Sequence, residues 1–274
     1  MRIRPDEREG DCLRDIMRAM SRNHSSTPIT SRQNQWFRRF RDALADHDRE
    51  ILIEGPKMIS DAIAGGWTPI AVARSIEVAP SLFGRVEDVI TFAADLFASL
   101  VETKTSQGVV GLFARPQGTL AGIMEDERLV VVLDGVQDPG NVGTIVRLAA
   151  AFDAAGVVAT PGTADPYGPK AIRSSAGAIL NVPTVAATPE EIQRIAAQYG
   201  RPLFTADADG DASGIVTDAG VLVFGREGSG VSSSLSRGAG QIAVATSGRV
   251  ESLNVAASAA ILLSRSFEQR RSRR

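Results

Sequence analysis

The sequence contains a single cysteine, Cys12, and two histidines, His24 and His47, among its 274 residues. One cysteine excludes a disulfide within the chain, and so few Cys and His residues argue against a dedicated metal site. We therefore expect no bound metal and place both histidines on the surface. The chain also lacks an apolar run long enough to span a bilayer and a signal-peptide pattern. These absences predict a soluble, cytoplasmic protein.

Lysine is almost missing as well. Of the 30 basic residues, three are lysines (Lys57, Lys104 and Lys170) and the others are arginines. Arginine binds phosphate through a planar fork and stacks on bases, so this bias is compatible with RNA binding. A genomic preference for arginine codons explains it equally well, and the formal net charge of −2 does not indicate a nucleic-acid partner. The basic C-terminal end, RSFEQRRSRR, is expected to be a solvated, disordered tail that can contact phosphates.

The pattern along the chain predicts a flexible leader and two domains. Residues 1–27 are polar and without a sustained period, with a short helix expected at 11–20. Residues 28–117 form a small α/β unit, in which Thr30 or Ser31 caps the first helix. Its helices are expected at 31–45, 56–64 and 94–102, and its strands at 51–55, 69–73, 88–92 and 107–115. The turn-rich, acidic segment 116–127 is interpreted as a linker.

Residues 118–274 form the second predicted domain. Its β-branched and apolar runs lie at 129–136, 156–160, 202–206, 220–225 and 241–245. Helical patterns separate these runs, which indicates right-handed crossovers and a parallel sheet covered on both faces. The fold class is therefore α/β. In such a sheet, ligands bind beyond the carboxyl ends of the strands.

Two of the segments that follow strands carry residues suited to chemistry. In DGVQDPGNVGTIVR, Asn141 lies near the start of a helix and Arg147 follows six residues later, so we expect both side chains to reach a common site. An Asn at this point is ordinarily a helix cap. In FGREGSGVSSSL, Glu227 projects from a glycine-rich turn. This turn matches neither a Walker loop nor the dinucleotide fingerprint.

A third segment, VATSGRVESLNVAAS, leads into the last apolar helix. It places Glu251, Ser252 and Asn254 at the helix start, where unpaired N–H groups and the helix dipole favour anionic ligands. Capping of the helix accounts for one of these three residues. The three together favour a ligand site.

Longer strings around these segments resemble a known family. DPGNVGTIVRLAAAF, FGREGSGVS and GRVESLNVAASAAILL are similar, in order and separation, to the three motifs of the SpoU (TrmH-type) branch of the SPOUT RNA 2′-O-ribose methyltransferases. The strings ITSRQNQWFRRFRDAL, ILIEGPKMISDAI and TKTSQGVVGLF resemble the small L30e-like RNA-binding domain of many such enzymes. The resemblance spans residues 28–268. It implies a C-terminal trefoil knot, S-adenosylmethionine as cofactor and a homodimer with facing knots.

The resemblance also implies roles for individual residues. The implied cofactor-binding residues are Gly225, Val244, Thr246, Gly248 and Leu253. The implied catalytic residues are Asn141, Arg147, Glu227, Ser252 and Asn254. Arg173 matches a basic position of relatives and is implied to bind RNA. In the small domain, we expect Lys57 and Lys104 to contact RNA phosphates. The family usually has Ile-Pro-Met where this chain has Val244-Ala245-Thr246, which changes the stiffness of a loop that contacts the cofactor.

Simpler interpretations exist for several of these residues. Val244 and Leu253 can serve core packing, Glu227 can form an ordinary ion pair, and Arg173 can be a plain surface arginine. A guanidinium pKa above about 12 makes Arg147 a poor general base. We interpret Arg147 as a donor that grips a phosphate and stabilises the developing alkoxide.

The leading hypothesis is S-adenosylmethionine-dependent 2′-O-methylation of RNA, with 23S ribosomal RNA as substrate because an L30e-like domain suits structured RNA. Transfer RNA is the alternative substrate. A catalytically silent RNA-binding protein of the same fold is a second hypothesis, but the motif residues are all present. An unrelated nucleotide-binding enzyme would need a phosphate loop or an acidic metal cluster, and the sequence has neither.

Overall fold

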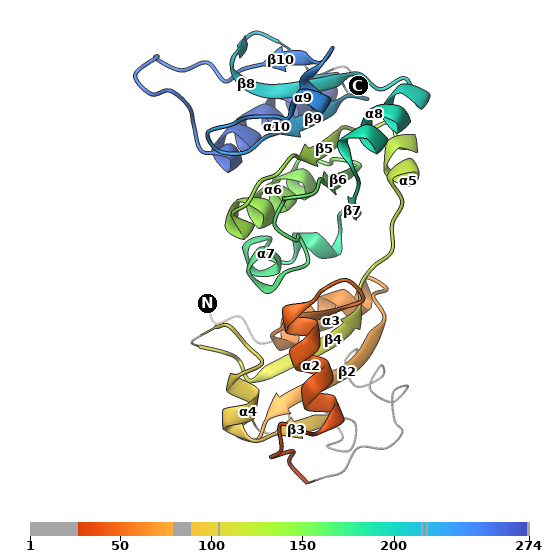
Figure 1. Ribbon diagram of the computed structural model, residues 1–274, viewed down its shortest axis with the longest axis vertical. Coiled ribbons are helices and arrows are strands. Elements are labelled where there is room, and N and C mark those ends of the chain that lie inside the picture. The colour runs from red at the N-terminus through yellow and green to blue at the C-terminus, as the bar shows by residue number, and fades with distance from the viewer. Residues whose placement is uncertain (1–26, 79–88, 104, 215, 218, 273–274) are drawn as a thin grey trace, which may run out of the picture. The chain divides into compact units, whose positions relative to one another are not determined.

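The computed structural model describes residues 27–272 except 79–88, 104, 215 and 218, so Lys104 and the helix expected at 11–20 lie outside the described residues. The chain divides into two compact units, Met1–Pro116 and Gln117–Arg274 (Figure 1). In the described part of the chain, no helix has the length and apolarity needed to cross a membrane.

Unit 1 contains a four-stranded mixed sheet in the order β1-β4-β2-β3. Its elements are α2 (Gln35–Ala45), β1 (Glu50–Glu54), α3 (Pro56–Ala64), β2 (Pro69–Ser75), β3 (Ile90–Phe92), α4 (Ala94–Ala98) and β4 (Val109–Ala114). The β2–β3 pair is parallel, whereas β4 is antiparallel to both β1 and β2. Phe37 and Phe40 of α2 pack edge-on against Phe92, with ring centroids 6.0 and 5.7 Å apart.

The first helix of unit 1 begins later than the sequence predicts. Asn34, and not Thr30 or Ser31, caps it, because the Asn34 side chain accepts the N–H of Trp36 at 2.8 Å. Residues 31–34 form turns before α2 begins at Gln35.

Unit 2 contains a six-stranded sheet in the order β10-β8-β9-β5-β6-β7, in which every neighbouring pair is parallel. Its first elements are α5 (Leu120–Glu125), β5 (Val130–Leu133), α6 (Pro139–Ala151), β6 (Gly156–Ala159), α7 (Pro169–Ser174), the 3₁₀ helix η3 (Ala178–Leu180) and β7 (Thr184–Ala186). The chain continues with α8 (Pro189–Gln198), β8 (Leu203–Asp211), β9 (Val221–Phe224), α9 (Ser233–Ser236), β10 (Gly240–Ile242) and α10 (Val255–Ser272). The predicted α/β fold class with a parallel sheet is confirmed.

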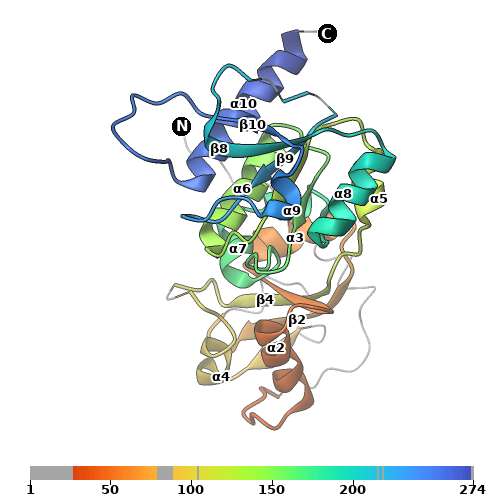
Figure 2. The same ribbon diagram turned by 45° about the horizontal axis from the view of Figure 1, so that its top comes forward.

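Helices cover both faces of this sheet (Figures 1 and 2). Successive residues of a strand point to opposite faces, so a strand buried on both sides must be apolar throughout. Val130, Val132 and Val223 pack in one cluster with residues of α5, α8 and α9. On the other side α6 lies against both α7 and α10. The connections that leave the carboxyl ends of the strands are thereby held on a rigid support.

The linker predicted at 116–127 is wrong in its second half. Thr119 caps α5 by accepting the N–H of Gly122 at 3.0 Å, and Ile123 and Met124 are buried against the sheet. Leu120, Ile123 and Met124 recur at helical spacing, so their apolar face can be buried against α8.

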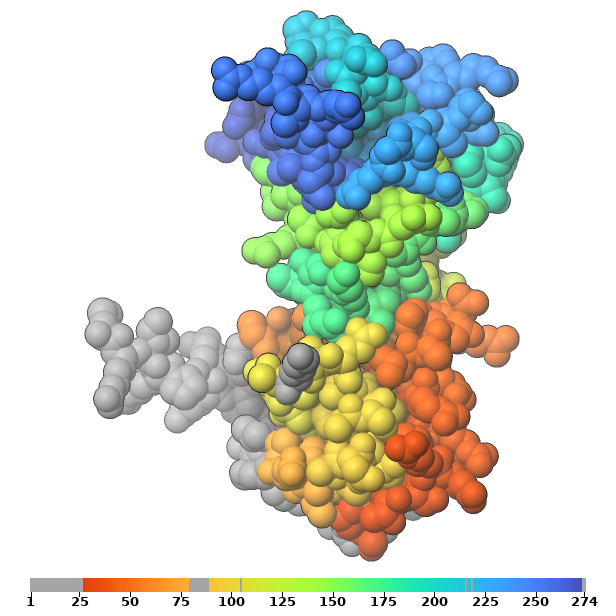
Figure 3. Space-filling model, turned by 60° about the vertical axis from the view of Figure 1, so that its left-hand side comes forward, coloured from red at the N-terminus to blue at the C-terminus, as the bar shows by residue number. Residues whose placement is uncertain are grey.

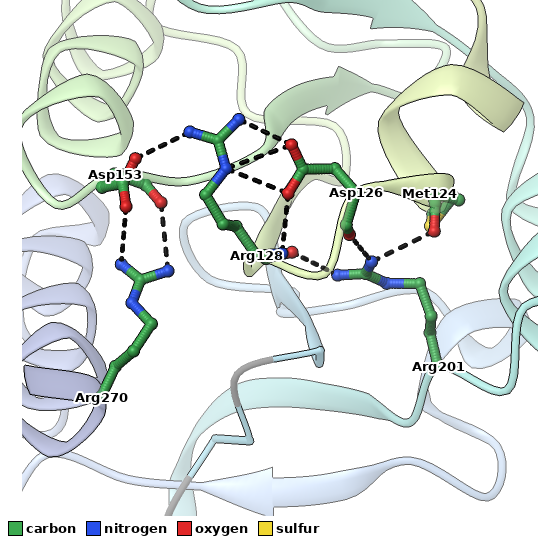
Figure 4. Close-up of polar contacts among 6 residues, drawn as sticks. All are labelled: Met124, Asp126, Arg128, Asp153, Arg201 and Arg270. Atoms are coloured by element: carbon green, nitrogen blue, oxygen red, sulfur yellow. Dashed lines mark hydrogen bonds and ion pairs between the residues drawn. The ribbon is translucent and has the colours of Figure 1, made fainter. Parts of the chain in front are cut away.

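The prediction of a disordered C-terminal tail is also wrong, since α10 continues to Ser272. Arg270 is only 9% exposed and donates to the carbonyl oxygen of Phe152 at 2.8 Å. It also donates to the carbonyl oxygen of Asp153 at 3.2 Å (Figure 4). It also pairs with the Asp153 carboxylate at 3.6 Å. A guanidinium at the C-terminal end of α6 satisfies carbonyls that the helix leaves free. Arg270 therefore fastens α10 to α6.

Candidate active site at the carboxyl ends of the strands

The connection from β5 to α6 is held by Asp138. Its side chain accepts the backbone N–H of Asn141 at 3.0 Å and caps α6, and it pairs with Lys170 of α7 at 3.1 Å. The Asn141 N–H, together with the Lys170 ammonium, holds the pKa of Asp138 below its ordinary value. Because Asp138 is the cap, the alternative interpretation of Asn141 as a helix cap is wrong, and the Asn141 side chain is available for other contacts.

Side chains from all three motif segments meet in one cluster. Asn141 Nδ2 donates to Glu227 Oε1 at 2.7 Å. Asn254 Nδ2 lies 3.2 Å from Asn141 Oδ1 and 3.4 Å from Glu227 Oε1. Residues far apart in the sequence thus form a continuous hydrogen-bonded group, which we call the Asn141–Glu227–Asn254 cluster.

Asn254 joins this cluster to the start of α10. Its Oδ1 accepts the backbone N–H groups of Ala256 and Ala257 at 2.9 and 3.3 Å. One side chain therefore caps the helix through its oxygen and bonds the cluster through its nitrogen, which fixes the orientation of the amide. Asn254 is thus explained both by the capping of α10 and by its place in the cluster.

Asp134, which directly follows β5, is not among the site residues predicted from the sequence. It is 7% exposed and accepts the Thr160 hydroxyl at 2.9 Å and the Ser232 N–H at 2.7 Å. It therefore ties the loop after β9 to the ends of β5 and β6. A carboxylate placed directly after a fully apolar strand is a signal that could have identified it.

A cavity of about 480 Å³ lies beside the cluster. Its lining comes from the middle of β8, the carboxyl end of β9, the glycine-rich turn, the segment after β10 and the first half of α10. Figure 3 shows these cyan to blue stretches next to one another on the surface. The predicted site residues in its wall are Gly225, Glu227, Val244, Thr246, Ser252 and Leu253.

The turn at one side of this cavity is closed by backbone bonds between Arg226 and Gly230, both 3.0 Å long. A Cβ on Gly225 would lie 2.2 Å from the carbonyl carbon of Gly230, so no side chain fits at position 225. Glycine there allows the turn to fold back tightly and leaves the cavity open.

A smaller cavity of about 290 Å³ adjoins the first and shares three lining residues with it, Arg226, Glu227 and Ser229. Its remaining wall is the β5–α6 connection, including Asp138 and Asn141. The shared boundary contains Glu227, so the Asn141–Glu227–Asn254 cluster lies where two ligands in the two cavities would meet.

Four predicted site residues lie elsewhere. Arg147 is exposed, lines neither cavity and makes no side-chain hydrogen bond or ion pair to other described residues. Six residues rotate an α-helix by about 240°, so Asn141 and Arg147 leave α6 on different sides, and the expected common site is not formed within this chain. Gly248 does not line the larger cavity, Arg173 is half-buried in the last turn of α7, and Lys57 pairs with Asp61 at 3.3 Å.

A family model with the description SpoU rRNA Methylase family matches residues 128–264. The chain belongs to this family. It is 31% identical over 218 residues to the 23S rRNA (guanosine(2553)-2′-O)-methyltransferase RlmP of Bacillus subtilis, covering 78% of this chain and 86% of that protein. The recognition of the family from its three motifs is confirmed.

Solved structures share the fold. The SpoU methyltransferase AviRb of Streptomyces viridochromogenes, in complex with the cofactor AdoMet, has a TM-score of 0.77 at 26% identity, covering 88% of this chain and 99% of that one. An AdoMet-bound rRNA methyltransferase of Sinorhizobium meliloti has a TM-score of 0.75 at 25% identity, with coverages of 89% and 98%. The similarity spans both units of the chain.

Proposed function

We propose that this protein is an RNA 2′-O-ribose methyltransferase that uses S-adenosylmethionine and acts on 23S ribosomal RNA. The observation that carries the proposal is the Asn141–Glu227–Asn254 cluster at the boundary of two adjoining cavities. The family, and relatives such as RlmP that act on ribosomal RNA, support the reaction and the substrate class.

The larger cavity fits S-adenosylmethionine in size and charge. A volume of about 480 Å³ is within the range for small-molecule sites. Its wall combines apolar side chains with the carboxylates of Asp207, Glu227 and Glu251, which suit a cationic sulfonium and ammonium. When bound, S-adenosylmethionine supplies an electrophilic methyl group. We assign Gly225, Val244, Thr246 and Leu253 to its binding, and keep Gly248 as a residue that shapes the loop.

The chain's own residues position the ribose. Asn141 and Asn254 hold Glu227 by hydrogen bonds, so the three groups present a fixed set of donors and acceptors to a ribose hydroxyl in the smaller cavity. Ser252, in the wall of the larger cavity, adds a hydroxyl on the cofactor side. Alignment of the 2′-oxygen with the methyl carbon, at about 3–3.5 Å, accounts for a large part of the acceleration of such a transfer.

Arg147 supplies positive charge to the RNA. Its exposed guanidinium has no intramolecular partner among the described residues, which leaves its donors free for a phosphate. We propose that the protein works as a cytoplasmic homodimer with a trefoil knot in unit 2, and that Arg147 completes a site to which both copies contribute. Exposed Ile261 and Ala257 on α10 support a contact with a second copy, whereas Ala256 and Ala259 are buried within the chain.

Unit 1 is proposed to be an L30e-like domain that binds structured RNA. It is a folded α/β unit of its own, with the mixed sheet and the aromatic core described above. We propose Lys57 and Lys104 of unit 1 and Arg173 of unit 2 as phosphate contacts. The Lys57–Asp61 pair is exposed, so RNA can displace Asp61 at little energetic cost.

The test is methyl transfer from labelled S-adenosylmethionine to RNA of a strain that lacks this gene, separated into large-subunit, small-subunit and transfer RNA. We expect label as a ribose methyl in the large-subunit fraction. Arg147→Ala should lower transfer by a factor of about 100 or more, as for loss of a donor that acts in the transition state, with cofactor affinity nearly unchanged. Arg194→Ala, an exposed arginine of α8, is the matched control.

Each result discriminates between hypotheses. Label in transfer RNA alone would refute the ribosomal substrate and keep the reaction. Cofactor binding without transfer to any fraction would refute methylation of mature RNA, and loss of cofactor binding in Arg147→Ala would make Arg147 a structural residue.

A further inference from the structure

Arg226 belongs to the glycine-rich turn after β9, and none of the motif roles derived from the sequence includes it. It is exposed and lines both cavities. An arginine at the boundary of a cofactor cavity and a substrate cavity can contact either ligand. The direction in which the Arg226 side chain points indicates which of the two ligands it contacts.

The side chain of Arg226 lies across two glycines in the connections that follow the neighbouring strands. A Cβ on Gly135 would lie 2.3 Å from Nε of Arg226, and a Cβ on Gly162 would lie 2.9 Å from its Nη2. Gly135 and Gly162 have φ angles of 74° and 86°, a conformation that glycine adopts without strain. These two positions therefore form a cradle that only residues without side chains can provide.

The cradle sets the direction of the guanidinium. In the sheet, β9 is followed on one side by β5 and β6 and on the other by β8 and β10. Gly135 follows β5 and Gly162 follows β6, so the side chain runs from β9 towards β6. The wall of the larger cavity includes the middle of β8 and the segment after β10, which lie on the opposite side of β9. The charged end of Arg226 thus points away from the cofactor and towards the smaller cavity.

Charges around the smaller cavity leave Arg226 unneutralised. Asp138 is paired with Lys170, and Glu227 is held by the amides of Asn141 and Asn254. Within the described residues, the Arg226 side chain forms no hydrogen bond or ion pair. A guanidinium with free donors beside a polar cavity is suited to bind a phosphate through two parallel hydrogen bonds.

We propose that Arg226 binds a phosphate of the RNA backbone next to the ribose that is methylated. This assignment rests on the proposed function, because it requires RNA in the smaller cavity. The phosphate held over Gly135 and Gly162 fixes the register of the nucleotide, so that its ribose meets the Asn141–Glu227–Asn254 cluster. Arg226 is then a substrate-binding residue of this chain.

The experiment measures binding of a labelled 23S rRNA transcript to the full chain over a series of NaCl concentrations. Each phosphate contact contributes about 0.7–0.9 to the slope of log affinity against log salt. Arg226→Met should weaken RNA binding by about tenfold, corresponding to ~1.4 kcal/mol, and lower the slope by about one contact. Arg226→Lys, which keeps the charge, should retain the slope, and Arg194→Met is the matched arginine control on α8.

The readouts separate this proposal from others. In Arg226→Met, the affinity for S-adenosylmethionine should stay within about twofold of wild type, because the fold and the larger cavity are intact. A large loss of cofactor affinity with an unchanged salt slope would assign Arg226 to the cofactor carboxylate and overturn the proposal. An unchanged slope alone also overturns it. Because RNA binding needs no methyl transfer, wild-type protein that binds the transcript without methylating it refutes the proposed function and not the Arg226 contact.

Discussion

Arg201, which precedes β8, connects residues 124–128 to Gly220, which precedes β9; Figure 4 shows its contacts with residues 124–128. Its side chain is 5% exposed. Nη1 donates to the carbonyl oxygens of Met124, at 3.1 Å, and Asp126, and Nη2 donates to those of Arg128 and Gly220, the latter at 3.3 Å. Burial lowers the pKa of Arg201, and the nearby Asp126 carboxylate opposes this effect. We predict that Arg201→Met strongly destabilises unit 2.

The magnitude follows from the contacts that the substitution removes. Methionine fills most of the space but leaves four carbonyl oxygens without this donor. A hydrogen bond from a charged donor contributes about 1.5–3 kcal/mol, but four bonds to one group are not additive, and burial of the guanidinium offsets part of them. We therefore expect a loss of about 3–5 kcal/mol, similar to that for breaking a buried charged contact. For a unit of this size the Tm should fall by roughly 10 °C.

The assay can follow the two units separately. Both tryptophans, Trp36 and Trp67, are in unit 1, so tryptophan fluorescence reports on that unit. Far-UV circular dichroism reports on both units. In Arg201→Met, the dichroism transition of unit 2 should move to lower temperature, whereas the fluorescence transition of unit 1 should stay unchanged. The control Arg194→Met, exposed on α8, should change stability by less than about 0.5 kcal/mol. A shift below about 2 °C in Arg201→Met would refute the reasoning.

Two further predictions concern acid stability and the cofactor cavity. The Arg128 side chain lowers the pKa of Asp126 to about 2, so wild type should be more stable than Asp126→Asn above about pH 4, by roughly 0.5–1 kcal/mol for a partly exposed pair. This difference should vanish as the pH falls through the folded-state pKa, and denaturant titrations in which it persists below about pH 2 would contradict the assignment. Gly225→Ala should raise the dissociation constant of S-adenosylmethionine at least about tenfold in calorimetry, because its Cβ would meet Gly230 at 2.2 Å; an unchanged constant would show that the turn can open without cost.

Local patterns were sufficient to predict much of the fold. The run Val130–Leu133 is apolar at every position because its strand is buried on both faces, and the same reasoning located β6, β8, β9 and β10. It missed β7, Thr184–Ala186, because a three-residue edge strand that is partly exposed has no apolar run to recognise. It misassigned α5, because the flanking turn and acidic residues obscured a short apolar face.

The fold class, the family and the three polar segments could be predicted from the sequence, because each depends on short-range periodicity or on a motif contained in one stretch of chain. Which of these side chains touch depends on the packing of distant segments. Asn141 lies 86 residues from Glu227 and 113 from Asn254, and their contacts arise because parallel strands bring their carboxyl ends to one edge. The same holds for Arg270. It is buried because its position on α10 places it against Asp153, which lies 117 residues earlier in the sequence. A charge pattern read locally predicts solvent exposure, whereas packing against a distant helix end makes the same residue part of the core.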